Sequence, residues 1–326
     1  MSNIGIIGAG AWGIALGINA HRNGHNVNIW HYDSKKANLL IEKRQIPALN
    51  RVNIPKKINF ISQLHEAINC DILIYAAPTQ VFDQITKEIY KIKDLKIPII
   101  IASKGIDTNN NLLLDQICKI NLPNSQPLIL SGPGFAIDIA NGLPTALTLA
   151  SESNHLLEQV GKIIANNNFR PYYNNDLIGV QVGGALKNII ALATGVAMGK
   201  KLGDGAIASL ISRGINEIII FGLALGANKD TFLGLSGLGD LVLTCTNMKS
   251  RNTQLGYQIG LSGEYKDETQ NLTEGIYTTQ AVYNMSKEMN LSLPIIEAIY
   301  NILYNGHSVD DVIDLLINRP LKKENF

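Results

Sequence analysis

The sequence has few cysteines, almost no net charge and no export signal. Its 326 residues include only Cys70, Cys118 and Cys245, which lie far apart and form no Cys-x-x-Cys pair. This odd, scattered set excludes a disulfide framework, offers no cysteine metal site and fits a reducing cytoplasm. No metal is expected. A net charge of +1 gives no reason to expect bulk affinity for nucleic acid or membranes.

The N-terminus also lacks the features of a secretory signal. Met1-Ser2-Asn3 leads directly into an apolar segment, without a basic region followed by a long apolar core. With 46% hydrophobic residues, 17% charged residues and 29 glycines, the composition is that of an ordinary globular protein that buries large cores. The length predicts about two domains.

The stretch from Gly179 to Gly199 has almost no charge, because Lys187 is its only ionisable side chain. About 20 apolar residues can span a bilayer. Gln181, Lys187 and Asn188 near the middle, and the absence of a polybasic flank, argue against a membrane span. We therefore expect a helix buried in a globular domain.

Lys187 has two interpretations. A lysine usually lays its stem along apolar surface and keeps its ammonium in water. On a helix that is apolar all round, however, little polar surface is available, and desolvation would lower the pKa of the amine. A lysine with a lowered pKa is suited to general acid and base catalysis near neutral pH. On this stretch alone both interpretations stay open.

The N-terminal segment carries a dinucleotide-binding pattern. A short strand at residues 4–7 is followed by Gly8-Ala9-Gly10-Ala11-Trp12-Gly13, a helical pattern at 14–22 and a second strand at 27–30. This is G-x-G-x-x-G between a strand and a helix, where the helix N-terminus binds the pyrophosphate. The pattern predicts a bound NAD or NADP.

The choice between the two nucleotides is open. Asp33 stands at the distance expected of an acid that binds the ribose hydroxyls of NAD. Ser34, Lys35 and Lys36 follow directly and are suited to a 2′-phosphate.

The first half of the chain continues to alternate strands with helices. Strands are expected at 70–77, 97–102, 128–130 and 145–150, and helices at 81–91 and 112–120. Such alternation predicts a parallel sheet covered on both faces, with ligands beyond the carboxyl ends of the strands. Lys104 and the Gly132 loop follow strands and would lie beside the cofactor, although an exposed loop lysine is the plainer interpretation of Lys104.

After about residue 175 the pattern becomes helical. Helices are expected at 206–225, 278–289, 295–304 and 309–317, with Arg213 and Glu217 spaced to pair across one turn. We therefore predict an α/β protein with an N-terminal doubly wound Rossmann-type parallel sheet, residues 1–175, followed by an all-α C-terminal domain, residues 176–326.

Two polar positions of the helical half stand out. Asp240 is a lone acid in an apolar run, and either a helix N-cap or a catalytic role suits it. Arg251 lies in the polar run Ser250-Arg251-Asn252, where it is either a surface charge or a phosphate ligand.

Taken together, these motifs give the chain a strong family resemblance. The ordered segments are GAGAWG at 8–13, ASKG at 102–105, SGPGFA at 131–136, IGVQVGGALKN at 178–188, GLGDLVLTC at 237–245, SRN at 250–252 and TEG at 273–275. In these segments the chain resembles the soluble NAD(P)-dependent glycerol-3-phosphate dehydrogenases of the bacterial type, nearly from end to end.

The resemblance implies a role for each matching residue. Lys187 would be the catalytic proton donor and acceptor. The implied substrate-binding residues are Lys104, Gly132, Gly134, Lys187, Asp240, Ser250, Arg251 and Asn252. The implied cofactor-binding residues are Gly8, Gly10, Ala11, Trp12, Gly13, Tyr32, Lys104, Ala136, Arg251, Leu272 and Glu274.

Two positions depart from the family pattern. Gly134 stands where the family commonly has threonine or another polar residue, so only backbone donation remains there. Ala11 replaces a frequent serine and removes one hydroxyl from the expected pyrophosphate contacts.

The resemblance implies reduction of dihydroxyacetone phosphate to sn-glycerol 3-phosphate with NAD(P)H, a role in phospholipid synthesis, a cytoplasmic location and a homodimer. Two other functions are possible alternatives to this dehydrogenase. A β-hydroxyacid or sugar-acid dehydrogenase of the same architecture would need a carboxylate site instead of a phosphate site. A non-catalytic dinucleotide-sensing protein would explain the glycine motif but not Lys187 and Asp240.

Overall fold

Contacts divide the chain into two compact units in the computed structural model, which describes residues 1–266, 273–320 and 323. Unit 1 comprises Met1–Ser103 and Leu112–Leu177, and unit 2 comprises Lys104–Asn111 and Ile178–Phe326. The expected division into domains at residues 175 and 176 stays a prediction.

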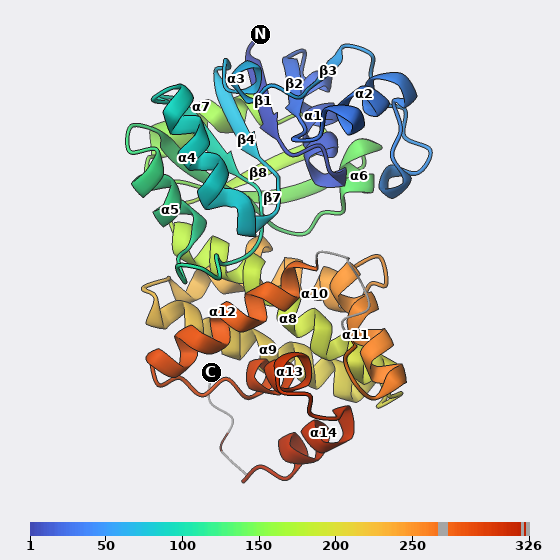
Figure 1. Ribbon diagram of the computed structural model, residues 1–326. Helices are drawn as coiled ribbons and strands as arrows, with labels where there is room; N and C mark the ends of the chain where they lie inside the picture. Colours follow the sequence, from blue (N-terminus) through green and yellow to red (C-terminus); the bar gives the residue numbers. More distant parts are fainter. Residues whose placement is uncertain (267–272, 321–322, 324–326) are drawn as a thin grey trace. The chain divides into compact units, whose positions relative to one another are not determined.

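Unit 1 is built on one eight-stranded sheet in the described part of the chain, with strand order β3-β2-β1-β4-β5-β6-β7-β8 (Figure 1). Its strands are β1 Asn3–Ile7, β2 Asn26–Trp30, β3 Ile58–Ile61, β4 Ile72–Tyr75, β5 Pro98–Ile101, β6 Gln126–Ser131, β7 Thr145–Ala150 and β8 Phe169–Asn174. The strand order reverses between β1 and β4, which is where a doubly wound sheet binds its ligand. This confirms the predicted fold class.

The predicted parallel sheet contains one antiparallel pair in the described part of the chain. Strand β7 runs antiparallel to β6, with Leu130 opposite Leu149, while β8 is again parallel to β7. The only helix between β6 and β7 is α6, Ala136–Ala140. Five residues of helix rise only ~7.5 Å, whereas a six-residue strand is ~20 Å long. The chain therefore does not return to the starting edge before β7 begins.

Helices cover both faces of the sheet. On one face α1, Ala11–Arg22, contacts α6 and α7, Asn154–Ile164. On the other face α4, Phe82–Ile92, contacts α3, Leu64–Ala67, and α5, Leu114–Asn121. The helix α2, Ser34–Lys43, packs against β3. Both faces of the central strands are consequently apolar: in β1, Ile4, Ile6 and Ile7 are almost fully buried.

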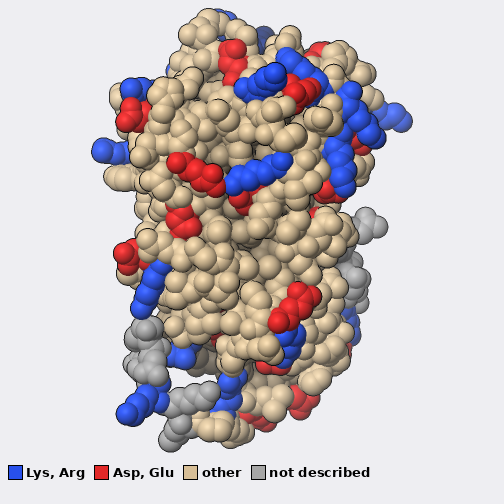
Figure 2. Space-filling model, turned by 90° about the vertical axis from the view of Figure 1, so that its left-hand side faces the viewer, with Lys and Arg blue, Asp and Glu red and all other residues tan. Residues whose placement is uncertain are grey.

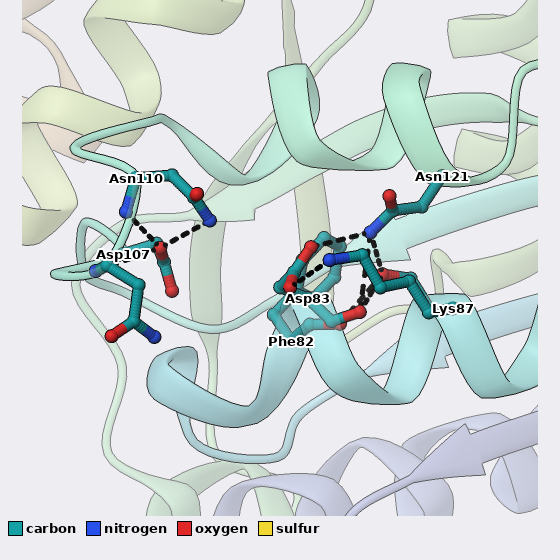
Figure 3. A network of polar contacts seen from close by, with 8 residues as sticks. Phe82, Asp83, Lys87, Asp107, Asn110 and Asn121 are labelled. Carbon is teal, nitrogen blue, oxygen red and sulfur yellow. Dashed lines mark hydrogen bonds and ion pairs between the residues drawn. The ribbon is translucent and has the colours of Figure 1, made fainter.

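A polar network joins α4 to the end of α5 (Figure 3). The Asn121 side-chain amide donates to Asp83 Oδ1 at 2.9 Å and to Thr86 Oγ1 at 2.9 Å. Asp83 also accepts from Lys87 Nζ at 2.6 Å, one helical turn along α4. Because the Lys87 side chain is 58% exposed, we assign this ion pair little stability and regard the Asn121 contacts as the part that fixes the helices.

Unit 2 is helical over the described residues that follow Leu177. Its α-helices are α8 Leu177–Gly199, α9 Asp204–Ala224, α10 Asp240–Cys245, α11 Arg251–Ser262, α12 Glu274–Glu288, α13 Pro294–Tyr304 and α14 Val309–Ile317. A 3₁₀ turn, Lys229–Leu233, and a π-helical turn, Leu235–Gly239, precede α10. Helix α13 ends at Tyr304, as expected of the helix at 295–304, and Gly306 follows with a φ of 67°.

Two described helices, α8 and α9, are long and apolar enough to cross a bilayer by length and composition alone. In α8, 94% of the most apolar window is buried in the protein, as in the core helix of a globular domain, against 44% in α9. On the face shown in Figure 2, uncharged residues cover most of the surface, and several basic side chains gather at the upper right with a few acidic ones among them.

Helix α8 crosses α11 at backbone contact. A Cβ atom added at Gly195 would overlap the Thr253 carbonyl oxygen, and one at Gly256 would overlap the Leu192 carbonyl oxygen. Each glycine costs up to ~1 kcal/mol of helix propensity. The close crossing brings α11 against the helix that carries Lys187.

The expected pair of Arg213 and Glu217 is wrong: these two described side chains form no ion pair. The Glu217 carboxylate instead accepts hydrogen bonds from the Ile295 and Ile296 amides, at 2.7 and 3.1 Å, and so caps the start of α13. Burial raises the pKa of Glu217 to about 7, although the two amides lower it. The orphan amides at the start of α13 compete successfully with the exposed Arg213 for this carboxylate.

This cap predicts a pH-dependent stability. Between the ordinary pKa of 4.5 and the folded value of about 7, the folded chain holds a proton that the unfolded chain has lost. The free energy of unfolding should therefore fall as pH rises through this window, by on the order of 2 to 3 kcal/mol. Urea unfolding of the wild type and of Glu217→Gln, at pH 5 and pH 7.5, measures the effect.

Glutamine does not titrate, so the variant should lose this part of the pH dependence. It should also be about 1 kcal/mol less stable at pH 5, since its amide nitrogen faces one of the two α13 amides. Equal changes with pH in both proteins would contradict the assignment.

Candidate active site

Lys187 lies in the middle of α8 with its ammonium buried. Its Nζ donates to Asp240 Oδ1 at 2.5 Å and to Thr244 Oγ1 at 2.7 Å. Its side chain is 9% exposed, and that of Asp240 is 1% exposed. The plainer expectation, in which the lysine reaches water, does not hold: the amine is held inside the protein by one acid and one hydroxyl.

Asp240 is shared between two lysines. Its second oxygen, Oδ2, accepts from Lys104 Nζ at 2.6 Å. Asp240 is the first residue of α10 and follows Gly239, but its side chain caps no backbone amide. The N-cap interpretation of this acid is therefore wrong. The carboxylate instead offsets part of the cost of burying two ammonium groups.

Lys104 opens a loop that groups with unit 2, residues 104–111. Within this loop the fully buried Asp107 accepts through Oδ2 from the Asn110 backbone amide at 2.8 Å and its side-chain amide at 3.0 Å (Figure 3). A third donor is the Asn109 amide at 3.1 Å. These bonds hold the loop into a compact turn three residues after Lys104.

The π-helical turn places Asp240 beside α8. A Cβ atom added at Gly183, one helical turn before Lys187, would lie 2.6 Å from the Ser236 carbonyl oxygen. This contact is possible only because position 183 is glycine. Single π-helical turns are frequently found at functional sites.

Sequence reasoning missed Thr244, although the segment 237–245 was singled out. Thr244 lies one turn after Asp240, so the two side chains share a face of α10. Its hydroxyl donates to the Asp240 carbonyl oxygen at 2.7 Å and therefore offers a lone pair to Lys187 Nζ. The i, i+4 spacing from a candidate acid was the signal that would have found it.

Burial lowers the pKa of Lys187 to about 8, because desolvation disfavours its charged form. Asp240 opposes this by attraction, and Lys104 adds to it by repulsion. The amine therefore gains and loses a proton close to neutral pH, as an acid and base catalyst requires.

The Ser250–Asn252 segment forms the start of α11. Ser250 is the N-cap, and its hydroxyl accepts from the Thr253 amide at 3.2 Å. Arg251 is exposed, as a ligand for a soluble anion needs to be. Asn252 is buried and donates to Asn188 Oδ1 at 3.0 Å, next to Lys187 in sequence. In unit 2, Asp240 thus bonds directly to both Lys104 and Lys187. Asn252 bonds to Asn188, the residue that follows Lys187.

One of the expected cofactor residues, Glu274, is the first residue of α12 and follows the N-cap Thr273. Leu272, another of them, lies outside the described residues.

The glycine loop of unit 1 fits a dinucleotide. Gly8 has a φ of 111°, and a Cβ atom there would lie 2.7 Å from the Ala77 amide nitrogen. At Gly13 a Cβ atom would overlap the Gly8 carbonyl oxygen, whereas around Gly10 the space is open. Gly8 thus allows the turn, Gly13 the helix packing, and Gly10 the approach of a pyrophosphate to the first amides of α1.

Other expected cofactor residues of unit 1 begin α1 or follow β2. Ala11 and Trp12 begin α1, and Trp12 Nε1 donates to the Ala102 carbonyl oxygen at 3.0 Å. Tyr32 is 74% exposed and stacks on His31. Asp33 caps α2, since its Oδ1 accepts from the Lys35 and Lys36 amides at 2.9 and 3.2 Å.

Gly132 and Gly134 lie between β6 and α6, and Ala136 is the first residue of α6. Gly132 has a φ of 137°, which favours glycine. A Cβ atom at Gly134 would lie 3.2 Å from Thr145 Cγ2 and 3.4 Å from Leu147 Cδ2. A side chain at position 134 would therefore require these two side chains to move by a few tenths of an ångström.

Two family models match the chain. The C-terminus of NAD-dependent glycerol-3-phosphate dehydrogenase matches residues 176–314, and the N-terminus of the same family matches residues 3–157. Among curated relatives, the glycerol-3-phosphate dehydrogenase [NAD(P)+] of Rhodopseudomonas palustris (strain BisB5) is 37% identical over 325 residues, 99% of this chain and 98% of that protein. The enzyme of the same name from Parvibaculum lavamentivorans is 38% identical over 330 residues, 98% of each chain.

Solved structures agree with these matches. Glycerol-3-phosphate dehydrogenase from Coxiella burnetii has a TM-score of 0.93 at 30% identity, covering 98% of this chain and 99% of that one. D-mandelate dehydrogenase has a TM-score of 0.64 at 13% identity, which indicates a similar fold alone. On the family models and full-length relatives, the chain belongs to the NAD-dependent glycerol-3-phosphate dehydrogenase family.

Proposed function

We propose that the protein interconverts dihydroxyacetone phosphate and sn-glycerol 3-phosphate with NAD(P)H. The observation that carries this proposal is the buried Lys187 ammonium, held by Asp240 and Thr244, in a chain that matches the dehydrogenase family at full length. A binding protein that only senses a dinucleotide has no need of such an amine.

In this reaction Lys187 is the acid and base. The bound dinucleotide supplies the hydride to the substrate carbonyl carbon. The Lys187 ammonium stabilises the negative charge that develops on the carbonyl oxygen and then transfers its proton to it. Asp240 and Thr244 fix the direction of the amine, and Lys104, on the other carboxylate oxygen, helps polarise the carbonyl. In the reverse direction neutral Lys187 accepts the proton of the alcohol.

The remaining expected residues take binding roles in this proposal. Arg251 binds the substrate phosphate with Ser250 and with the backbone of Asn252, whose side chain is used between helices. Gly132 and Gly134 contribute backbone donors. The dinucleotide is held by the glycine loop together with Ala11, Trp12, Tyr32, Lys104, Ala136, Arg251, Leu272 and Glu274. In support, Gly10 leaves open space before the first turn of α1, and Arg251 has an exposed guanidinium.

We also propose a homodimer, a cytoplasmic location and a supply of glycerol 3-phosphate to phospholipid synthesis. The dimer is supported by α9, in which fewer than half of the residues in the most apolar window are buried within one chain. An apolar helix face of this kind is commonly covered in an oligomer. Location and pathway follow the family resemblance.

The direct test is the loss of reduced-nicotinamide absorbance when dihydroxyacetone phosphate is added to the purified protein with NADH or NADPH. We expect turnover, and the ratio of the two kcat/KM values decides between the Asp33 and the Lys35–Lys36 interpretation of the ribose site. Acetoacetate, a β-keto acid, is the control substrate and should not turn over. Activity on acetoacetate alone would favour a β-hydroxyacid dehydrogenase instead.

Lys187→Ala should lower kcat by about 10²- to 10⁴-fold and leave the Kd for NADPH unchanged. Lys187→Arg keeps the charge but does not release its proton near neutral pH, so it should be similarly inactive. In the wild type the reduction rate should fall above a pH of about 8, and the oxidation rate should rise towards the same pH. Pre-steady-state and pH-rate measurements check this, and an active Lys187→Ala enzyme would refute the assignment.

Arg251→Ala should raise the KM for dihydroxyacetone phosphate by about 10- to 100-fold, since one charge-assisted hydrogen bond is lost. Lys249→Ala is the matched control, because it removes an equal charge two residues earlier, outside α11. Steady-state kinetics at fixed cofactor compare the two variants. Equal effects of both would mean that a diffuse field, and not a specific contact, attracts the phosphate.

A further inference from the structure

The Asn252 carboxamide joins three helices of unit 2. From the first turn of α11, its Nδ2 donates to Asn188 Oδ1 of α8 at 3.0 Å. Its Oδ1 accepts from the Gly275 amide of α12 at 3.1 Å. Asn252 is 9% exposed and Asn188 is 6% exposed. Both ends of one buried side chain are therefore used to connect neighbouring helices.

The Gly275 amide is one of the orphan donors of a helix N-terminus. Amides in the first turn of a helix have no partner within the helix. The N-cap Thr273 makes no side-chain capping bond to them. Asn252 thus supplies part of the capping of α12 from a different helix, which fixes where α12 begins.

The packing at Gly275 supports this connection independently. A Cβ atom at position 275 would overlap Asn252 Oδ1 and would lie 3.1 Å from the Asn188 carbonyl oxygen and 3.0 Å from Leu192 Cδ1. Only glycine lets the backbone of α12 approach both asparagines. Asn252, which accepts the hydrogen bond, and Gly275, which donates it, therefore fit each other in shape as well as in polarity.

We propose that Asn252 is a positioning residue that couples the first turn of α12 to Asn188 on the catalytic helix. Asn188 directly follows Lys187, and Gly275 directly follows Glu274. Movement of Asn252 is thereby transmitted to a residue beside the acid and base catalyst and to one beside a cofactor residue. The measurement of NADPH affinity described below rests on the proposed role of Glu274. The measurement of hydrogen–deuterium exchange does not.

The experiment compares Asn252→Ala, Asn252→Asp, Gly275→Ala and the double variant Asn252→Ala/Gly275→Ala. The Kd for NADPH is measured by fluorescence without substrate, and hydrogen–deuterium exchange is followed in the peptide that contains Gly275. Gln258→Ala, which removes an exposed carboxamide from the same helix, is the control. Thermal unfolding confirms that each variant is folded.

Asn252→Ala and Gly275→Ala should each raise the Kd for NADPH about tenfold and speed exchange at the start of α12. The double variant should bind no more weakly than Asn252→Ala, because the overlap at position 275 disappears with the asparagine. Asn252→Asp keeps the acceptor for the Gly275 amide and should lose less affinity than Asn252→Ala. The control should match the wild type.

The proposal is overturned if Asn252→Ala raises only the KM for dihydroxyacetone phosphate, with NADPH affinity and exchange unchanged. Additive losses in the double variant would overturn it as well. If the wild type fails to reduce dihydroxyacetone phosphate, the proposed function fails, while the exchange data still decide the coupling. If Asn252→Asp alone folds well, its intermediate exchange rate is the deciding measurement.

Discussion

The helical unit depends on a buried carboxylate that is shared by two ammonium groups, one of them buried and one partly exposed. Removing charges from water is costly, and a buried ion pair returns that cost only with good geometry and further hydrogen bonds. Asp240 meets this condition with one oxygen for Lys187 and one for Lys104, and Thr244 adds a hydroxyl. The burial that makes the cluster expensive is also what brings the pKa of Lys187 down to about 8. Stability and reactivity are set by the same arrangement.

Much of the remaining helical unit serves to bring backbones close to that cluster. The glycines of α8 let the π-helical turn and α11 lie in direct contact with it. Where two backbones are in direct contact, no side chain lies between them that could adjust. The contacts between the helix backbones therefore determine where Asp240 and Asn252 lie. Close-packed interiors transmit small displacements rather than absorbing them.

Sequence patterns predicted the fold class and most long helices, since alternation of apolar strands with helices and the glycine motif are local signals. They missed β3 and β8, which lie at the two ends of the sheet; β8 is largely polar and exposed. They also missed the antiparallel β7 and the Glu217 cap, which depend on contacts between distant segments. In the site, Lys187 could be singled out by its apolar surroundings. Its hydrogen bonds to Asp240 and Thr244, and the sharing of Asp240 with Lys104, depend on the tertiary structure and cannot be predicted from sequence spacing.

The loop from Lys104 to Asn111 belongs by its contacts to unit 2, although the sequence on either side of it belongs to unit 1. The two units are therefore not separable by a single cut in the chain. A fragment that ends near residue 175 would keep Lys104 without the Asp240 carboxylate, and would keep the fully buried Asp107 without the unit that its loop packs with. Gene dissection or domain exchange at that boundary would leave both products incomplete. An exchange of unit 2 would have to include residues 104–111 together with the segment that starts at residue 178.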